Sequence, residues 1–137
     1  MIETNRIVLN GLHERKGVLS TLPRFTSRYH PTFSSEESSF SALLFLCDIV
    51  NEMIEEIDKL TDPIDKLRQR FQLASLFLCV FLELHPFADG NGRTATILSN
   101  HIIGLPFCVV VSKDRGDYLL ALESSRQKEL SWQNVVV

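Results

Sequence analysis

Apolar residues recur at intervals of three and four along the middle of this 137-residue chain, a pattern that predicts helices. The first long helix is expected to begin at the capping box Ser34-Ser35-Glu36-Glu37, with Ser34 as the N-cap, and to run to about Leu60. Its other face carries acidic side chains and is expected to be solvated. The apolar stripe consists of Phe40, Leu43, Leu44, Cys47, Val50, Ile54 and Ile57.

A second helix is predicted from Asp62 to Leu84, because Asp62-Pro63 places an N-cap residue before a proline at the first helical position. From Leu73 onward this segment is apolar on nearly every side, so we expect a central helix that others cover all round. His85 is the next step on its apolar stripe. The helix would therefore hold His85 rigidly at the edge of a cleft.

The apolar pattern breaks at a glycine-containing loop and resumes in a third helix, predicted from about Asn91 to Ile103 and ended by Gly104. Gly90 and Gly92 allow backbone N–H groups to converge on one concavity. The start of the following helix adds unpaired N–H donors and the positive end of the helix dipole. The sequence therefore predicts an anion site, and phosphate is the usual anion at such a place.

Three side chains in and beside this loop suit chemistry on a phosphate. Asp89 can hold Mg²⁺, which shares its coordination with water and phosphate oxygens. Arg93 offers a planar, permanently charged fork for phosphate oxygens. His85 carries an imidazole, the side chain best suited to proton transfer near neutral pH.

Simpler interpretations of the loop fit less well. A hairpin turn at Asn91-Gly92 is disfavoured because the flanking segments have a helical and not an alternating pattern. An EF-hand loop beginning at Asp89 lacks the later calcium ligands. A P-loop is excluded because no G-x-x-x-x-G-K-[ST] string occurs.

The stretch His85-Pro86-Phe87-Ala88-Asp89-Gly90-Asn91-Gly92-Arg93 resembles the Fic family motif H-P-F-x-[D/E]-G-N-G-R-x-x-R. The match is continuous through Arg93, and Thr96 stands where the motif has its last arginine. The resemblance extends over about Thr61 to Leu130. It implies an all-α fold, a compact helical bundle with a small β-hairpin flap, as a single Fic-like domain over residues 1–137. The flap is expected near residues 16–28.

The resemblance also implies an activity. Most Fic proteins transfer AMP from ATP to a protein hydroxyl (AMPylation), which makes His85 the catalytic base and Asp89 the Mg²⁺ ligand. The nucleotide would be bound by Gly90, Asn91, Gly92 and Arg93. The implied partners are ATP, a target protein with a Ser, Thr or Tyr hydroxyl, and a regulatory or antitoxin-like protein. The roles of toxin, secreted effector and housekeeping regulator are all left open.

Thr96 leaves alternatives open, because by resemblance the missing arginine normally grips the terminal phosphate. A Doc-like phosphotransferase is one alternative, since the Doc branch also lacks this arginine. Transfer from another diphosphate donor is a second, and a weakened nucleotide- or protein-binding module is a third. Ser125 to Glu129 matches most of the family's inhibitory motif, but Leu130 breaks it and the glutamate's usual partner is absent. We interpret that match as coincidental.

Composition limits the classes of function. Apolar residues make up 45% of the chain and charged residues 23%, which is typical of a globular protein. A net charge of -3 argues against bulk nucleic-acid binding. The apolar run Leu73 to Leu82 is too short to cross a membrane, and no signal peptide is visible, so we expect a cytoplasmic location or delivery into a host cytosol. Cys47, Cys79 and Cys108 lie in apolar runs and are expected to be free, buried thiols.

The two ends of the chain are less regular. Ile7-Val8-Leu9 is either a strand or the end of a short helix. Leu105 to Val111 is extended and apolar, and in Fic proteins such a connection leads to the next helix. That helix is expected over residues 114–128.

Overall fold

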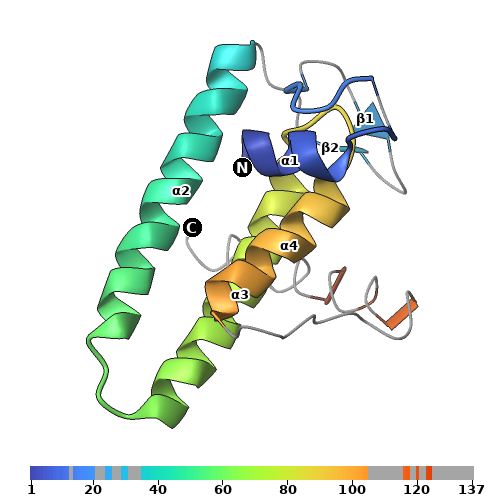
Figure 1. The fold of residues 1–137 in the computed structure, drawn as a ribbon. Coiled ribbons are helices and arrows are strands. Elements are labelled where there is room, and N and C mark those ends of the chain that lie inside the picture. The colour runs from blue at the N-terminus through green and yellow to red at the C-terminus, as the bar shows by residue number, and fades with distance from the viewer. Residues whose placement is uncertain are drawn as a thin grey trace, which may run out of the picture.

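The computed structural model describes residues 1–12, 14–20, 24–25, 29–30, 35–104, 116–117, 120 and 123–124. In chain order its elements are α1 (Ile2–Val8), β1 (Arg24–Phe25), β2 (Tyr29–His30), α2 (Glu36–Asp58), α3 (Pro63–Leu84) and α4 (Asn91–Ile103). Figure 1 shows α2 and α3 as a long antiparallel pair, with α4 lying along α3. Helix α1 and the strands gather at the end where α4 begins. The fold is the predicted all-α bundle with a small hairpin.

Helix α2 begins one residue later than its sequence suggested. The N-cap is Ser35, whose side chain accepts a hydrogen bond from the Ser38 N–H at 3.2 Å. The Ser38 hydroxyl in turn accepts a bond from the Ser35 N–H at 3.1 Å, which completes a capping box. The predicted box with Ser34 and Glu37 was therefore wrong, because a serine can fill the return position as well as a glutamate. The helix also ends earlier than predicted, at Asp58.

Helix α3 starts as predicted. Its N-cap Asp62 accepts a hydrogen bond from the Ile64 N–H at 2.9 Å, and Pro63 occupies the first turn. Its expected enclosure on every side was wrong, since the Leu76 side chain remains 49% exposed. Helices α2 and α4 cover two of its faces.

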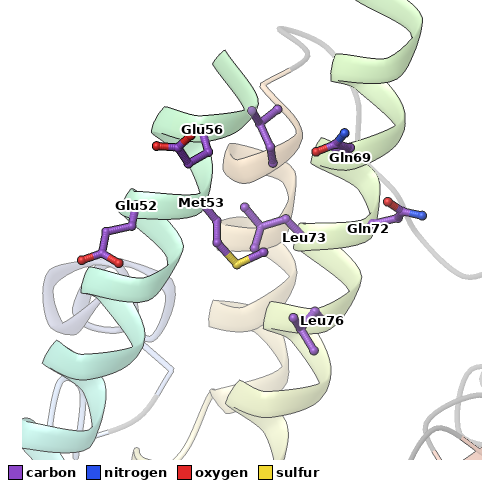
Figure 2. Close-up of a pocket in the computed structure, with 8 residues that line it drawn as sticks. Glu52, Met53, Glu56, Gln69, Gln72, Leu73 and Leu76 are labelled. Carbon is purple, nitrogen blue, oxygen red and sulfur yellow. The ribbon is translucent and has the colours of Figure 1, made fainter. Parts of the chain in front are cut away.

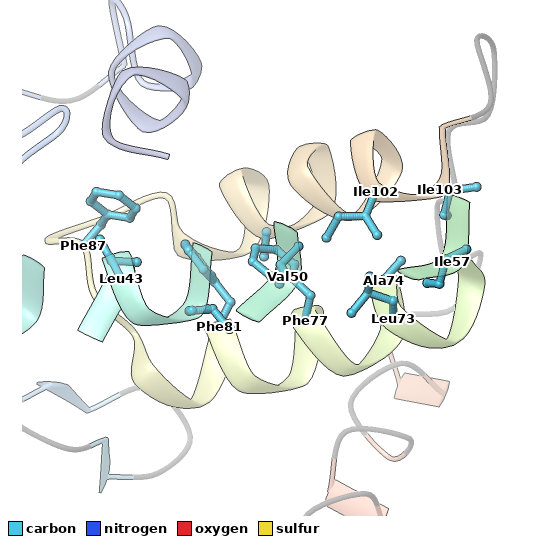
Figure 3. Close-up of a cluster of buried hydrophobic side chains, with 12 residues drawn as sticks. Leu43, Val50, Ile57, Leu73, Ala74, Phe77, Phe81, Phe87, Ile102 and Ile103 are labelled. Atoms are coloured by element: carbon cyan, nitrogen blue, oxygen red, sulfur yellow. The ribbon is translucent and has the colours of Figure 1, made fainter. Parts of the chain in front are cut away.

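The core lies between the three long helices, as Figure 3 shows. Phe77 and Phe81 of α3 are essentially fully buried, and their rings are 5.4 Å apart between centroids. Burial of side chains of this size contributes roughly 1.5–3 kcal/mol each. The remaining members of the cluster are Leu43, Leu46, Val50 and Ile57 of α2, Leu73 and Ala74 of α3, Phe87 of the loop, and Ala95, Ile102 and Ile103 of α4.

The far end of the bundle is joined by one arginine. Arg70 of α3 donates to both carboxylate oxygens of Asp58 at 2.7 Å, and also to the Ile102 carbonyl of α4 at 3.1 Å. Its side chain is 15% exposed. The hydrogen bond from Arg70 is the main reason that the pKa of Asp58 lies below its ordinary value. This one guanidinium therefore ties the end of α2 to α3 and α4.

The N-terminal region resolves one open alternative and corrects one boundary. Helix α1 ends at Val8, so Ile7-Val8-Leu9 is the end of a short helix. Strands β1 and β2 are antiparallel, with Arg24 opposite His30 and Phe25 opposite Tyr29. The predicted flap range of 16–28 thus contains β1 and stops just before β2. Before the strands, Leu19 pairs with Phe87 of the loop between α3 and α4.

The remaining expectations concern the cysteines, the C-terminal segments and the absence of a membrane-spanning helix. Cys47 and Cys79 are free and partly buried, and burial raises the pKa of the Cys47 thiol. Cys108, the Leu105 to Val111 connection and the inhibitory-motif match all lie outside the described residues. The described residues between 114 and 128 have helical conformations. In the described ranges, no helix has the length and apolar character needed to cross a membrane.

Candidate active site

The loop between α3 and α4 begins with a reversal at His85. Pro86 has no N–H and disfavours the right-handed helical conformation in the residue before it, so α3 ends at Leu84. His85 is the C-cap in a left-handed conformation, φ 47° and ψ 53°, and its N–H donates to the Phe81 carbonyl at 3.0 Å. His85 therefore does not continue the apolar stripe of α3, contrary to the expectation from spacing, because it lies outside the helix.

Residues 86–88 are fixed by a short antiparallel pairing with the segment before the flap. The Ser20 N–H donates to the Pro86 carbonyl at 2.8 Å, and the Ala88 N–H donates to the Val18 carbonyl at 2.9 Å. Between them, Phe87 is fully buried and packs on Phe81. Its predicted role as an anchor of the loop is confirmed. The base of the flap and the residues after His85 are thus joined directly by backbone hydrogen bonds.

The Asn91 side chain turns inward. Its Oδ1 accepts from the Phe87 N–H at 2.9 Å, and its Nδ2 donates to the Phe87 carbonyl at 2.8 Å. The residue is buried. The asparagine of the motif therefore closes the loop on itself through its side chain.

Gly90 is the N-cap of α4 and has φ 75°. A Cβ at this position would lie 3.0 Å from both Cγ and Cδ2 of Leu9 and 3.1 Å from Nδ2 of Asn5. Glycine is therefore required both by the backbone angle and by the close approach of the N-terminal segment. Within the described part of the chain, no side chain caps the start of α4. The N–H groups there are thus not occupied by a protein cap, as an anion site needs.

Asp89 and Arg93 face each other across the start of α4. Arg93 Nη2 donates to Asp89 Oδ2 at 3.4 Å, and the two side chains are 45% and 48% exposed for Asp89 and Arg93 respectively. An exposed pair at this distance holds its partners weakly. Both groups can therefore turn toward a ligand at small cost. Gly92 is exposed, and nothing lies within 4 Å of a Cβ built on it.

Thr96 lies one turn after Arg93 and is occupied locally. Its hydroxyl donates to the Gly92 carbonyl at 3.0 Å, within its own helix. It therefore offers no cationic group and no freely directed donor where the motif has its last arginine.

One residue that supports this loop was missed in the sequence. Asn5 of α1 is fully buried and bonds to the Asp89 carbonyl, the Thr94 hydroxyl and the Gly17 N–H. The signal was present, because Ile2, Asn5 and Leu9 share one face of a helix and only Asn5 is polar. A polar residue on an otherwise apolar face indicates a buried hydrogen-bonding role.

A groove of about 370 Å³ lies between α2 and α3, away from this loop (Figure 2). It is bordered near the end of α2 and along the middle of α3, whereas His85 follows the last turn of α3. The predicted site residues do not contribute to it. Its lining consists of Glu52, Met53, Glu56, Ile57, Gln69, Gln72, Leu73 and Leu76.

A sequence model described as the Fic/DOC family matches residues 1–103, which include α1, the flap strands and the whole loop. The chain belongs to the Fic/DOC family. The motif resemblance is therefore confirmed at the level of the family. In this Fic/DOC chain, the motif loop, residues 18–20 before the flap strands, and α1 lie together at one end of the bundle.

Known proteins similar to this Fic/DOC chain include two curated relatives and one solved structure. The ribonucleoside-diphosphate reductase small chain of Ostreid herpesvirus 1 is 31% identical over 130 residues, covering 91% of this chain and 22% of that protein. The protein adenylyltransferase fic-1 of Caenorhabditis elegans is 28% identical over 134 residues, covering 95% of this chain and 24% of that protein. A crystal structure of a Fic domain containing signaling protein from Bacteroides thetaiotaomicron has a TM-score of 0.64 at 28% identity, covering 89% of this chain and 45% of that one. The chain thus spans less than a quarter of the length of these two curated relatives.

Proposed function

We propose that this Fic/DOC chain transfers AMP from ATP to a Ser, Thr or Tyr hydroxyl of a target protein. The observation that carries the proposal is that the inward-facing polar groups of the motif loop are bonded to protein, whereas the N–H groups at the start of α4 have no side-chain cap among the described residues. The inward-facing groups include the Phe87 peptide and the Asp89 carbonyl. This arrangement suits a phosphate. The name of the Caenorhabditis elegans relative, protein adenylyltransferase, points the same way.

His85 is the catalytic base in this proposal. It takes the proton of the target hydroxyl while the oxygen attacks the α-phosphorus of ATP. The bond from that phosphorus to the bridging oxygen breaks, and pyrophosphate leaves. Arg93 and the N–H groups of Gly90, Asn91 and Gly92 bind the phosphate oxygens. Because residues 18–20 pair with the loop just after His85, the flap is anchored close to the base and can present the target segment.

The donor set fits Mg²⁺. Within the described ranges, no group of three or more His, Cys, Asp or Glu side chains could hold a metal ion alone. Asp89 offers one partly exposed carboxylate with a weak ion pair to Arg93. Mg²⁺ characteristically takes one or two protein carboxylates and completes its shell with water and substrate phosphates. Asp89 would hold the ion, which when bound neutralises charge on the phosphates.

Thr96 favours a second candidate, phosphoryl transfer of the Doc type. The Thr96 hydroxyl is bonded within α4, so the terminal phosphate of ATP lacks the cationic grip that the motif arginine supplies. The loss of one charge-assisted hydrogen bond lowers affinity about tenfold to a hundredfold. Without that anchor, ATP can bind with its γ-phosphate toward His85, which would make the transferred group a phosphoryl group.

The variant Thr96→Arg separates these candidates. An arginine one turn beyond Arg93 restores a second cation on the same face of α4, and we expect AMP transfer from ATP to rise. Protein acceptors from a cell lysate are incubated with Mg²⁺ and ATP, and mass spectrometry identifies AMP or phosphate on hydroxyl side chains. Thr96→Ser is the matched control, because it keeps the hydroxyl that bonds to Gly92 and should leave the product unchanged. Phosphate as the sole modification in the wild type would reject adenylyl transfer.

A further inference from the structure

Asn5 lies where four segments of the chain meet. Its Nδ2 donates to the Asp89 carbonyl at 2.9 Å and to the Thr94 hydroxyl oxygen at 3.0 Å. Its Oδ1 accepts from the Gly17 N–H at 2.8 Å. The residue is fully buried, and Leu9 of the same segment packs against Gly90. One amide therefore connects α1, the loop before α4, the first turn of α4 and the segment that leads to the flap.

The bond to Asp89 fixes the direction of a neighbouring N–H group. In a trans peptide, the C=O of one residue and the N–H of the next point in opposite directions. The Asp89 carbonyl is held toward Asn5, so the Gly90 N–H points away from Asn5. The bond from Asn5 to the Thr94 hydroxyl holds the first turn of α4 against the same amide. The Thr94 N–H in turn donates to the Gly90 carbonyl at 2.9 Å. The peptide before Gly90 is thus oriented by Asn5 itself, and the peptide after Gly90 is oriented by Thr94, which Asn5 contacts.

We propose that Asn5 is a positioning residue of the anion site, which holds the Asp89–Gly90 peptide so that the Gly90 N–H faces the phosphates of ATP. The inference rests on the proposed function for the identity of the ligand. Through Gly17, the same amide fixes the base of the flap relative to this peptide. The site for the nucleotide and the support for the target segment therefore share one side chain.

The test compares two ligands that differ in phosphate. The affinities of ATP with Mg²⁺ and of adenosine are measured by calorimetry for the wild type and Asn5→Ala, below the unfolding temperature of each. We expect ATP affinity to fall about tenfold to a hundredfold in the variant, because an N–H bond to a charged oxygen is lost. Adenosine affinity should not change. Equal losses for both ligands, or no loss for ATP, would overturn the proposal.

Matched variants guard against a general defect in folding. Asn10→Ala removes an exposed asparagine near the end of α1 and should leave both affinities unchanged. Thr94→Val removes the hydroxyl that orients Asn5 while keeping the shape of the side chain, so ATP affinity should fall. Thr94→Ser keeps the hydroxyl and should restore ATP affinity toward the wild-type value. Identical ATP affinity in the valine and serine variants would contradict the role of Asn5.

Failure of this inference can be told from failure of the proposed function. A wild-type protein that binds ATP without transferring AMP rejects the function, while the comparison of ATP with adenosine still decides the role of Asn5. If the wild-type protein transfers AMP, and Asn5→Ala has no selective loss of ATP affinity, only the role of Asn5 is rejected. A wild-type protein that binds no ATP overturns both.

Discussion

An alanine at position 90 would place a methyl group where the N-terminal segment meets the motif loop. Gly90 has φ 75°, in the left-handed region, and its Cβ would lie 3.0 Å from Cγ and Cδ2 of Leu9. Leu9 is fully buried, so it has little room to move. The change therefore combines backbone strain with overpacking at one point.

The magnitude follows from these two terms. The left-handed conformation costs an alanine about 1–2 kcal/mol relative to glycine. Overpacking by one methyl group in a buried site costs about 1–3 kcal/mol. The stiffer unfolded chain of the alanine variant offsets about 0.4–1 kcal/mol. The expected net loss for Gly90→Ala is thus roughly 1–5 kcal/mol, or a fall in Tm of roughly 3–20 °C.

Gly92→Ala is the matched control, because it adds the same methyl group two residues later, in the first turn of α4. Nothing lies within 4 Å of a Cβ there, and Gly92 is already inside α4, so we expect unchanged or slightly higher stability. Urea unfolding followed by helical circular dichroism gives the free energy of unfolding of both variants. Equal stabilities of the two variants would refute the reasoning, since the close approach to Leu9 would then have no energetic consequence.

Two further predictions concern buried and acid-sensitive contacts. Asn91→Ala leaves the Phe87 N–H and C=O unpaired and should lower the free energy of unfolding by about 2–4 kcal/mol. The control is Asn100→Ala, which removes an amide that bonds to the Thr96 carbonyl within the same helix and should change the free energy of unfolding little. Equal losses for the two variants in urea unfolding would contradict this prediction. Arg70 lowers the pKa of Asp58, so that contribution to stability is present above the unfolded-state pKa and is lost as pH falls through the folded-state pKa. Asp58→Asn should therefore be less stable than the wild type at pH 7, and a difference that stays constant down to strongly acid pH would count against the Arg70 contact.

The helices could be predicted from sequence because each has its own local signals. Asp62-Pro63 begins α3, and Gly104 ends α4 with φ 75°. The start of α2 was missed by one residue, because adjacent serines compete for the cap and only the fold selects Ser35. Local signals thus determine that a helix exists more firmly than they determine its first residue.

The sequence predicts where the candidate site lies, but it does not predict the contacts between distant residues that hold the site in place. The motif residues from His85 to Arg93 are contiguous, so the sequence alone places them together, in the loop after α3 and the first turn of α4. The contacts of Asn5 with Gly17 and Asp89 join residues far apart in the chain, and no periodicity encodes such pairings. The pairing of Leu19 with Phe87 likewise joins distant residues and has no local signal in the sequence.

The central claim is that His85 directs a hydroxyl of a target protein to the α-phosphate of ATP. The most direct test uses ATP labelled separately at the α- and γ-phosphates, with Mg²⁺, the wild-type chain, and a cell lysate as the source of acceptors. We predict that protein acquires the α label with the wild type and none with His85→Ala, although that variant still binds ATP, because the base acts on the hydroxyl and not on the phosphates. Label from the γ position alone, or α label that persists in His85→Ala, would contradict the account.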